Sequence, residues 1–303
     1  MAALLILTGA CLYGVSPILA KIAYGYGVTP LVLMTWRVSI SAALFWTAAL
    51  AFRQVAPVGG RMLGALVILG TTLVPAQVYS YFYALSLLPA STASVIVNTS
   101  PVHVAWIERL ALGEQIARVD LLILGAIVAG AILVGGATPH AGHTFGFVVL
   151  GAATLASAFY LVIQRRVVRD VPPVMMLAVI QLSSAAVYWI AVAVTREPLS
   201  PPAQPAMIAM VTSAFTASIA SFLVLIALRT LAATRTAMLG MLEPVVTVIL
   251  SVALLSDAMT WPRLAGIVTV LGGITTFYWR LRQPAGTVGF AASGSTGGGS
   301  GAL

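Results

Sequence analysis

The sequence predicts an all-α membrane protein of ten transmembrane helices, arranged as two inverted five-helix repeats. Three observations predict this fold class. The 303 residues are 60% hydrophobic and only 7% charged, whereas about 25% of the residues in soluble domains are charged. The apolar residues form ten runs of membrane-spanning length, about 20 residues each. The chain also matches itself without a gap when it is shifted by about 143 residues.

The composition excludes several classes of protein. No water-soluble fold could bury so much apolar surface, so the surrounding solvent must be lipid. The net charge of +8 would suit nucleic-acid binding, but the basic residues stand singly between apolar runs, as anchors at membrane edges do. Cys11 is the only cysteine, so an intramolecular disulfide and a cysteine zinc site are impossible. We expect no metal and no cofactor.

The helices follow from the apolar runs and the polar or proline-rich breaks between them. The first run resembles a signal peptide, but it lacks a positive leading region and has a repeat partner at 149–163, so we expect a retained helix. No ten-residue stretch alternates as a β-barrel strand would. The predicted helices are 3–23, 30–52, 62–87, 91–110, 119–136, 145–167, 173–194, 205–228, 233–255 and 262–279.

The repeat pairs unusual residues as well as common ones. Trp46 coincides with Trp189 and Pro101 with Pro244, which a chance match of alanine-rich helices would not require. The expected domains are 1–140 and 141–283, and the Gly/Ser-rich residues 284–303 form a flexible tail without chemistry.

Five helices in each repeat are an odd number, so the second repeat enters the membrane in the opposite sense. With the N-terminus inside, eleven arginines lie on the inner side, against Lys21, Arg196 and Arg263 outside. This excess predicts that both termini are cytoplasmic. The eleven are Arg53, Arg61, Arg109, Arg118, Arg165, Arg166, Arg169, Arg229, Arg235, Arg280 and Arg282.

Two segments carry a resemblance to a known family. LSLLPASTASVIVNTSPVHVAWIERLALGEQIAR and IALRTLAATRTAMLGMLEPVVTVILSVALLSDAMTWPR resemble the two copies of the EamA repeat of the drug/metabolite transporter superfamily. Each has a small-residue helix start, a mid-helix Pro-Val and an apolar run, which ends in Leu-Gly-Glu in the first and in Leu255-Ser256-Asp257 in the second. TWRVSISAAL is similar to the second-helix segment of the family, and Lys21 stands where the family often closes its first helix.

The resemblance covers residues 4–280. It implies ten helices, with the fifth and tenth at the periphery, a central cavity and alternating access. It also implies solutes such as amino acids, amines, drugs and other metabolites, often moved outward. YddG-type amino-acid exporters are similar in architecture. A bacterial-type cytoplasmic membrane is the implied location, and one chain is sufficient, although a homodimer is compatible.

Two charged residues lie well inside predicted helices. Glu243 lies about 15 Å from the inner end of its helix, and Arg37 about 10 Å from the outer end of its own. A buried carboxylate there must be protonated, paired or hydrated. Glu243 is either a site for a proton or a cationic group, or the partner of Arg37. Arg37 either pairs with Glu243, receives a solute carboxylate or reaches toward the outer interface.

Pro101 and Pro244 occupy equivalent mid-helix positions. Each removes a backbone donor and frees carbonyl groups near Val97 and Gly240. Paired interruptions in two repeats predict a binding site at the midplane, and simple bending of both helices is the alternative. Pro17, on the first helix, matches Tyr160 rather than a proline.

Further candidates surround these positions, and plain packing is the alternative for each. His103 is a candidate for proton coupling, because histidine is the side chain that most readily exchanges a proton near neutral pH. The aromatic and amide side chains of 77–83 cannot all face one way. The complete set of predicted binding or gating residues is Tyr13, Ser16, Arg37, Gln77, Tyr79, Asn98, Thr99, Ser100, Pro101, His103, Tyr160, Glu243 and Pro244.

The predicted function is secondary transport, as export, of small organic solutes such as amino acids by alternating access. An uncoupled facilitator and an amphiphilic-cation exporter of the same fold remain open. The chain has no phosphate-loop Gly-Lys, no His-Glu-x-x-His and no Gly-x-Ser-x-Gly, which argues against a pump and an intramembrane enzyme. A channel would need a filter ring. Small residues in AGAILVGG and LGGITTF predict close helix contacts within the fold or in a dimer.

Overall fold

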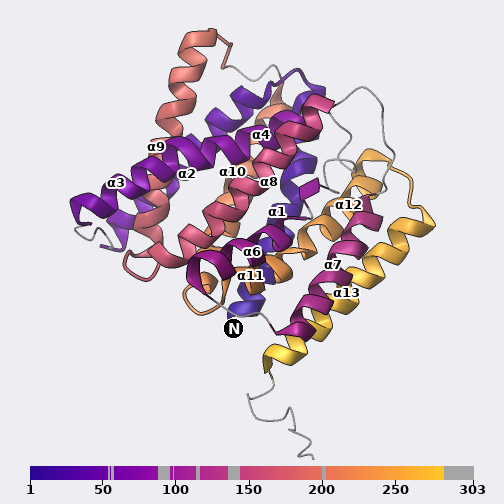
Figure 1. Ribbon diagram of the computed structural model, residues 1–303. Helices are drawn as coiled ribbons and strands as arrows, with labels where there is room; N and C mark the ends of the chain where they lie inside the picture. The colour runs from indigo at the N-terminus through magenta and orange to yellow at the C-terminus, as the bar shows by residue number, and fades with distance from the viewer. Residues whose placement is uncertain are drawn as a thin grey trace, which may run out of the picture.

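The computed structural model describes residues 1–53, 55, 58–87, 96–97, 99–113, 117–135, 144–199 and 203–282. These residues form helices joined by short connections (Figure 1). The helices are α1 (Ala2–Gly25), α2 (Pro30–Ala51), α3 (Gly60–Ile68), η1 (Leu69–Leu73), α4 (Val74–Leu87), α6 (Ser100–Leu112), α7 (Arg118–Gly135), α8 (Thr144–Val167), α9 (Pro173–Thr195), α10 (Gln204–Leu228), α11 (Ala233–Gly240), α12 (Leu242–Leu255) and α13 (Trp261–Arg282).

The predicted fold class is confirmed. The segments α3, η1 and α4 form one continuous helix, and α11 and α12 are two parts of a broken one, so the described residues supply ten helical segments. Eight of them are long and apolar enough to cross a membrane. Large apolar side chains also cover the outside, such as Leu122 (74% exposed) and Val194 (77% exposed). Such a surface is suited to lipid rather than to water.

Local sequence signals set several helix ends. The Thr29 hydroxyl accepts a hydrogen bond from the backbone N–H of Val32 (3.3 Å), and Pro30 occupies the first turn of α2. Both residues favour a helix start, because the Thr29 cap accepts a hydrogen bond from a free backbone N–H and Pro30 has no N–H that needs an acceptor. Gly113 ends α6 in the left-handed conformation (φ 67°), which glycine adopts without strain.

A π-helical turn, η1, interrupts the third segment, and the sequence did not predict it. Gly70 lies so close to α9 that a Cβ atom there would be 2.5 Å from the backbone oxygen of Ile180. The Ser184 hydroxyl donates to the Gly70 carbonyl (2.7 Å). A side chain that inserts into the hydrogen-bond ladder is a known cause of such irregular turns. The turn is therefore set by tertiary contact.

The most extensive helix contacts join the first half of the chain to the second. They are α1 with α10, α2 with α9, α4 with α8, and α7 with α13. In the repeat, α1 is equivalent to α8, α4 to α10 and α6 to α12. The contact of α1 with α10 therefore has an equivalent in the contact of α8 with α4, and the contact of α1 with α12 has one in the contact of α8 with α6. The halves therefore interlock about a pseudo-two-fold axis, as inverted repeats do.

Glycines let α7 and α13 meet closely. A Cβ on Gly266 would lie 2.5 Å from the Gly130 backbone oxygen, and one on Gly273 would lie 2.5 Å from Ile127 Cγ1. Gly130 belongs to AGAILVGG and Gly273 to LGGITTF, so these two small residues serve a contact within the fold. Absent side chains allow the backbones to approach, which is how small residues stabilise helix pairs in lipid.

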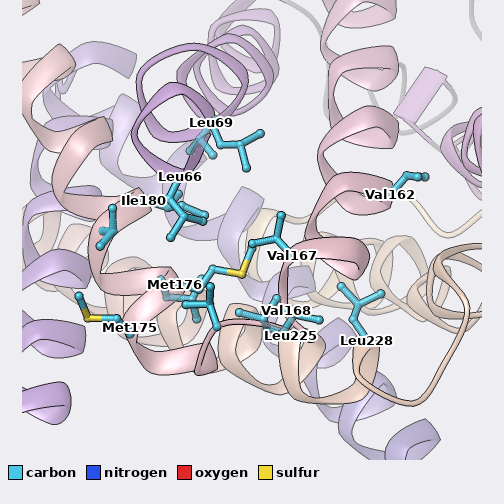
Figure 2. Close-up of a cluster of buried hydrophobic side chains, with 14 of the residues drawn as sticks. Leu66, Leu69, Val162, Val167, Val168, Met175, Met176, Ile180, Leu225 and Leu228 are labelled. Atoms are coloured by element: carbon cyan, nitrogen blue, oxygen red, sulfur yellow. The ribbon is translucent and has the colours of Figure 1, made fainter. Parts of the chain in front are cut away.

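The start of α1 and the end of α13 lie at the same end of the bundle (Figure 1), here called the terminal face; the opposite end is the far face. Near the terminal face, side chains from α3, η1, α8, α9 and α10 converge in an apolar cluster (Figure 2). A second cluster lies toward the far face and includes Val28, Met34, Leu85, Tyr188 and Met210. The middle of the bundle lies between these two clusters.

Candidate functional site

A cavity of about 350 Å³ lies in the middle of the bundle. Both halves of the chain line it, and its walls combine apolar side chains with hydroxyl, amide and charged groups. The polar and proline residues on the lining are Tyr13, Ser16, Pro17, Arg37, Gln77, Tyr81, Ser100, Pro101, Thr154, Ser157, Tyr160, Gln164, Gln181, Ser221, Thr236, Glu243, Pro244 and Thr247.

Equivalent positions of the two repeats line the cavity in pairs. The pairs are Ala10 and Ala153, Pro17 and Tyr160, Val38 and Gln181, Val74 and Ala217, Val78 and Ser221, Tyr81 and Val224, Val97 and Gly240, Ser100 and Glu243, and Pro101 and Pro244. The cavity therefore lies at the interface of the repeats, where inverted-repeat transporters bind their solutes.

The two predicted helix interruptions both open onto this cavity. Pro101 lies in the first turn of α6 and Pro244 in the first turn of α12. The break between α11 and α12 falls at Met241 (ψ 0°). Val97 and Gly240, where freed carbonyl groups were expected, line the cavity. A helix tolerates proline in its first turn because the backbone N–H groups there have no partner within the helix. Each helix therefore restarts at the cavity wall.

Arg37 is held inside the bundle. Its residue surface is 9% exposed, its Nη1 donates to Ser16 Oγ (3.1 Å), and its guanidinium carbon lies 4.9 Å from the centre of the Phe82 ring. Ser16 Oγ lies 3.1 Å from Ser213 Oγ, which steadies the acceptor. Arginine has five N–H donors, so donors remain for a ligand in the cavity. The side chain does not reach toward the membrane interface.

Glu243 lies on the same lining as Arg37, but the predicted ion pair between them is not formed. Among the described residues, no carboxylate oxygen of Glu243 lies within 4.0 Å of a cationic nitrogen or makes a hydrogen bond with another side chain. Its backbone is anchored, since Thr247 Oγ1 donates to the carbonyls of both Glu243 and Gly14 (3.0 Å each). A Cβ on Gly14 would lie 2.8 Å from the Glu243 oxygen. The carboxylate is therefore held at the cavity without a protein partner.

The structure brings together most of the predicted residues. Tyr13, Ser16, Arg37, Gln77, Ser100, Pro101, Tyr160, Glu243 and Pro244 line the cavity. Tyr79, Thr99 and His103 lie off the cavity lining. The Tyr79 ring stacks on the ring of Tyr83 (5.8 Å between centroids), and His103 Nδ1 lies 3.1 Å from the backbone oxygen of Thr99. Asn98 lies outside the described residues.

Eight polar residues on the lining were not in the predicted set: Tyr81, Thr154, Ser157, Gln164, Gln181, Ser221, Thr236 and Thr247. Gln164 lies near the end of α8, where an amide resembles a membrane-edge residue, and Gln181 pairs with the apolar Val38 in the repeat. Gln77 and Gln164 are 9% and 6% exposed, and no hydrogen bond to their amides occurs among the described residues. Unpartnered buried amides on a cavity wall are free for a ligand or water.

A second buried carboxylate was missed by the sequence reasoning, which treated Glu243 as the only deep one. Glu108 is 1% exposed and forms an ion pair with Arg165 Nη1. Its two oxygens also accept hydrogen bonds from the backbone N–H groups of Ala233 and Thr234 (2.8 Å each). The negative charge thus lies at the N-terminus of α11, which such charges stabilise. Because Glu108 lies next to Arg109 near a helix end, the sequence resembled an exposed polar flank.

Comparison with known proteins agrees with this architecture. One solved crystal structure shares 22% sequence identity with this chain and superposes with a TM-score of 0.77; the match covers 93% of this chain and 99% of the other. At that identity the likeness shows the fold. No curated protein sequence matches. The sequence profile of the EamA-like transporter family matches residues 1–136 and again residues 144–279. The chain is therefore a membrane transporter of the EamA-like family, whose members are transporters rather than enzymes.

Proposed function

We propose that the protein is a secondary exporter of small zwitterionic solutes, amino acids or closely related metabolites, which it moves by alternating access. The observation that supports this proposal most directly is that Arg37 and an unpaired Glu243 line the same cavity. A solute with a carboxylate and an ammonium group offers each of them an opposite charge. Charge-assisted contacts of this kind are stronger than neutral hydrogen bonds.

The size and position of the cavity support a small solute. At about 350 Å³ it lies at the lower end of the roughly 300–1,000 Å³ typical of ligand pockets. The cavity lies where the repeats meet, so a rocking motion of one half against the other would expose it to each side in turn. A single chain supplies all of its described walls, and the proposal needs no second copy.

The proposed orientation places the terminal face in the cytoplasm of a bacterial-type inner membrane. The eleven arginines named above lie within about one turn of helix ends at that face, whereas Lys21, Arg196 and Arg263 lie near helix ends at the far face. Such an excess of basic residues is typical of cytoplasmic loops. Labelling single cysteines introduced at Arg166 and Arg196, in a Cys11→Ala background, tests this: the first must react from the cytoplasmic side.

An exporter of amphiphilic cations is the second candidate. Glu243 and the rings of Tyr13, Tyr81 and Tyr160 on the lining favour it, because aromatic faces and carboxylates attract cations. Arg37 opposes it, since a fixed positive charge in the same cavity repels such a solute. An uncoupled facilitator would use the same cavity and differ only in its response to a pH gradient.

Counterflow in proteoliposomes separates these candidates. Vesicles loaded with one neutral amino acid should accumulate its labelled form, and amines without a carboxylate should compete poorly. Arg37→Gln should abolish the discrimination between an amino acid and its decarboxylated amine. If cationic dyes exchange readily and amino acids do not, the cation-exporter candidate replaces the proposal. Flux that is equal with and without a pH gradient would favour the facilitator.

A further inference from the structure

We infer that Glu108 is a positioning residue that seals the terminal end of the cavity by tying α6 to α8 and α11. This inference rests on the proposed alternating access, because a seal matters only if the cavity opens toward that face. Both oxygens of the carboxylate are engaged. Oε1 contacts Arg165 Nη1 of α8 and accepts the Ala233 N–H of α11 (2.8 Å), while Oε2 accepts the Thr234 N–H (2.8 Å).

The clamp lies at the end of the cavity. Gln164 and Thr236 line the cavity; Gln164 precedes Arg165 of the clamp in the chain, and Thr236 lies two residues after Thr234. The same helix that bears Glu108 begins at the cavity, with Ser100 and Pro101 on its wall. Solute that passes between the terminal face and the cavity must therefore move between segments that this carboxylate joins.

Among the described residues, the repeat does not reproduce this clamp at the far face. The repeat equivalents of Glu108 and Arg165 are Ser251 and Ile22, which cannot form an ion pair. Ser251 Oγ donates within its own helix, to the carbonyl of Val248 (3.1 Å). Toward the far face, α1 and α4 are instead joined by an apolar cluster and by hydrogen bonds to backbone carbonyls, from Lys21 Nζ to Leu85 (2.7 Å) and from the Tyr24 hydroxyl to Phe82 (3.2 Å). A buried, fully engaged charge is costly to expose when only one partner leaves. The clamp therefore biases the two-state equilibrium toward closure at the terminal face.

The test measures access to the cavity directly. Ser157→Cys in a Cys11→Ala background places a reporter thiol on the cavity wall. A membrane-impermeant methanethiosulfonate reagent is applied to vesicles of either orientation, and the modification rate is measured from each face. Glu108→Gln should raise the rate from the terminal face about tenfold, as expected for a population shift of that factor, and should not raise the rate from the far face.

A second variant separates gating from stability. Glu108→Gln removes one charge of the Glu108–Arg165 ion pair and should lower the melting temperature, whereas Glu108→Gln/Arg165→Gln removes both charges of this pair and should recover folded protein. Under the inference the double variant remains open at the terminal face despite its recovered stability. The matched control is Asp120→Asn, which breaks the ion pair of Arg280 Nε with Asp120 Oδ1 (3.2 Å) between α13 and α7 and should leave both rates unchanged.

The outcomes are distinct. Unchanged terminal-face and far-face rates in the double variant would overturn the inference and leave Glu108 a purely structural residue. Equal increases from both faces would do the same, because they indicate general loosening. The measurement needs no solute, so failure to transport amino acids would overturn the proposed function while the accessibility result still stands.

Discussion

The carboxylates of Glu108 and Glu243 differ in what surrounds them, and this difference indicates different roles. Glu108 is engaged by Arg165 and two backbone N–H groups, whereas the Glu243 carboxylate forms no hydrogen bond or ion pair with a described side chain. A fully paired carboxylate stabilises the structure around it, and its loss leaves partners unpaired. A carboxylate facing a cavity without a partner is available to a proton or a cationic group.

The Glu243→Gln variant should therefore fold like the parent protein. The substitution breaks no described hydrogen bond or ion pair, so we expect a melting temperature within about 4 °C, the shift that ~1 kcal/mol produces at this size. Because the amide imitates the protonated acid, flux should no longer respond to a pH gradient. Thermal unfolding in detergent and proteoliposome flux at two pH values measure both effects.

Asp257→Asn is the matched control for Glu243→Gln, since it removes an exposed carboxylate beyond the end of α12. It should leave the pH response intact. Loss of folded Glu243→Gln protein, with recovery by an added Arg37→Gln change, would show that the two residues pair in another state and would contradict this assignment.

At the scale of the element, backbone contact rather than side-chain chemistry defines the peripheral pair α7 and α13. A Cβ atom on Gly266 would lie 2.5 Å from the backbone oxygen of Gly130 and 2.6 Å from the backbone nitrogen of Val134. Backbone atoms cannot move aside as a flexible side chain can. Overpacking of a tight contact costs about 1–3 kcal/mol.

Gly266→Ala should thus lower the melting temperature by roughly 2–4 °C for each kcal/mol lost. Gly272→Ala, in the same helix, is the control, because nothing lies within 4 Å of its added methyl group. Thermal unfolding of the two variants side by side measures the difference. Equal stability would mean that α7 and α13 do not pack as closely as described.

The broken helices lead to a further prediction about elements. Pro101→Ala and Pro244→Ala allow α6 and α12 to extend backward across the cavity wall, so we expect slower transport with little loss of folded yield. Pro30→Ala is the control, since Pro30 also occupies a first turn but lies off the cavity lining. Initial rates of counterflow measure the effect. If Pro101→Ala and Pro244→Ala both transport at the rate of the parent protein, the transport site lies elsewhere.

At the scale of the whole molecule, a symmetric scaffold carries asymmetric chemistry. Pro101 and Pro244 repeat the same break, but Ser100 is matched by Glu243, and Val38 by Gln181. Arg37 has Ile180 as its equivalent, which is buried in a core cluster. The repeat thus positions the cavity, and the departures from the repeat give it charge and polarity.

The interlocked halves also make the proposed division of the chain testable. Residues 1–140 and 141–303, expressed together as two chains, should assemble into a complex that melts close to the intact protein. Either half alone should accumulate poorly, because its principal packing partners are in the other half. Copurification through a tag on one half measures assembly. A stable, monomeric isolated half would contradict the interlocked arrangement.

The sequence was a good guide wherever local composition decides the structure. The ends of α2, α9 and α10 lie within a few residues of the predictions, because apolar runs end there at prolines and arginines. The cavity prolines were found through the repeat. Contacts between distant segments were not accessible in this way: the η1 turn depends on Ser184, and the partners of Glu108 lie on α8 and α11. No pattern in the surrounding residues reports such contacts.

The pairing of α1 with α10 has a consequence for how a cell makes this protein. The ribosome adds about 5–20 residues per second, so the first helix enters the bilayer roughly 10–40 s before its partner, Gln204–Leu228, has been synthesised. During that interval Arg37 and the serines of the early helices face lipid or an insertion factor. We therefore expect newly made chains to depend on the insertion machinery until the last helices arrive, and early truncations to be degraded rather than stored.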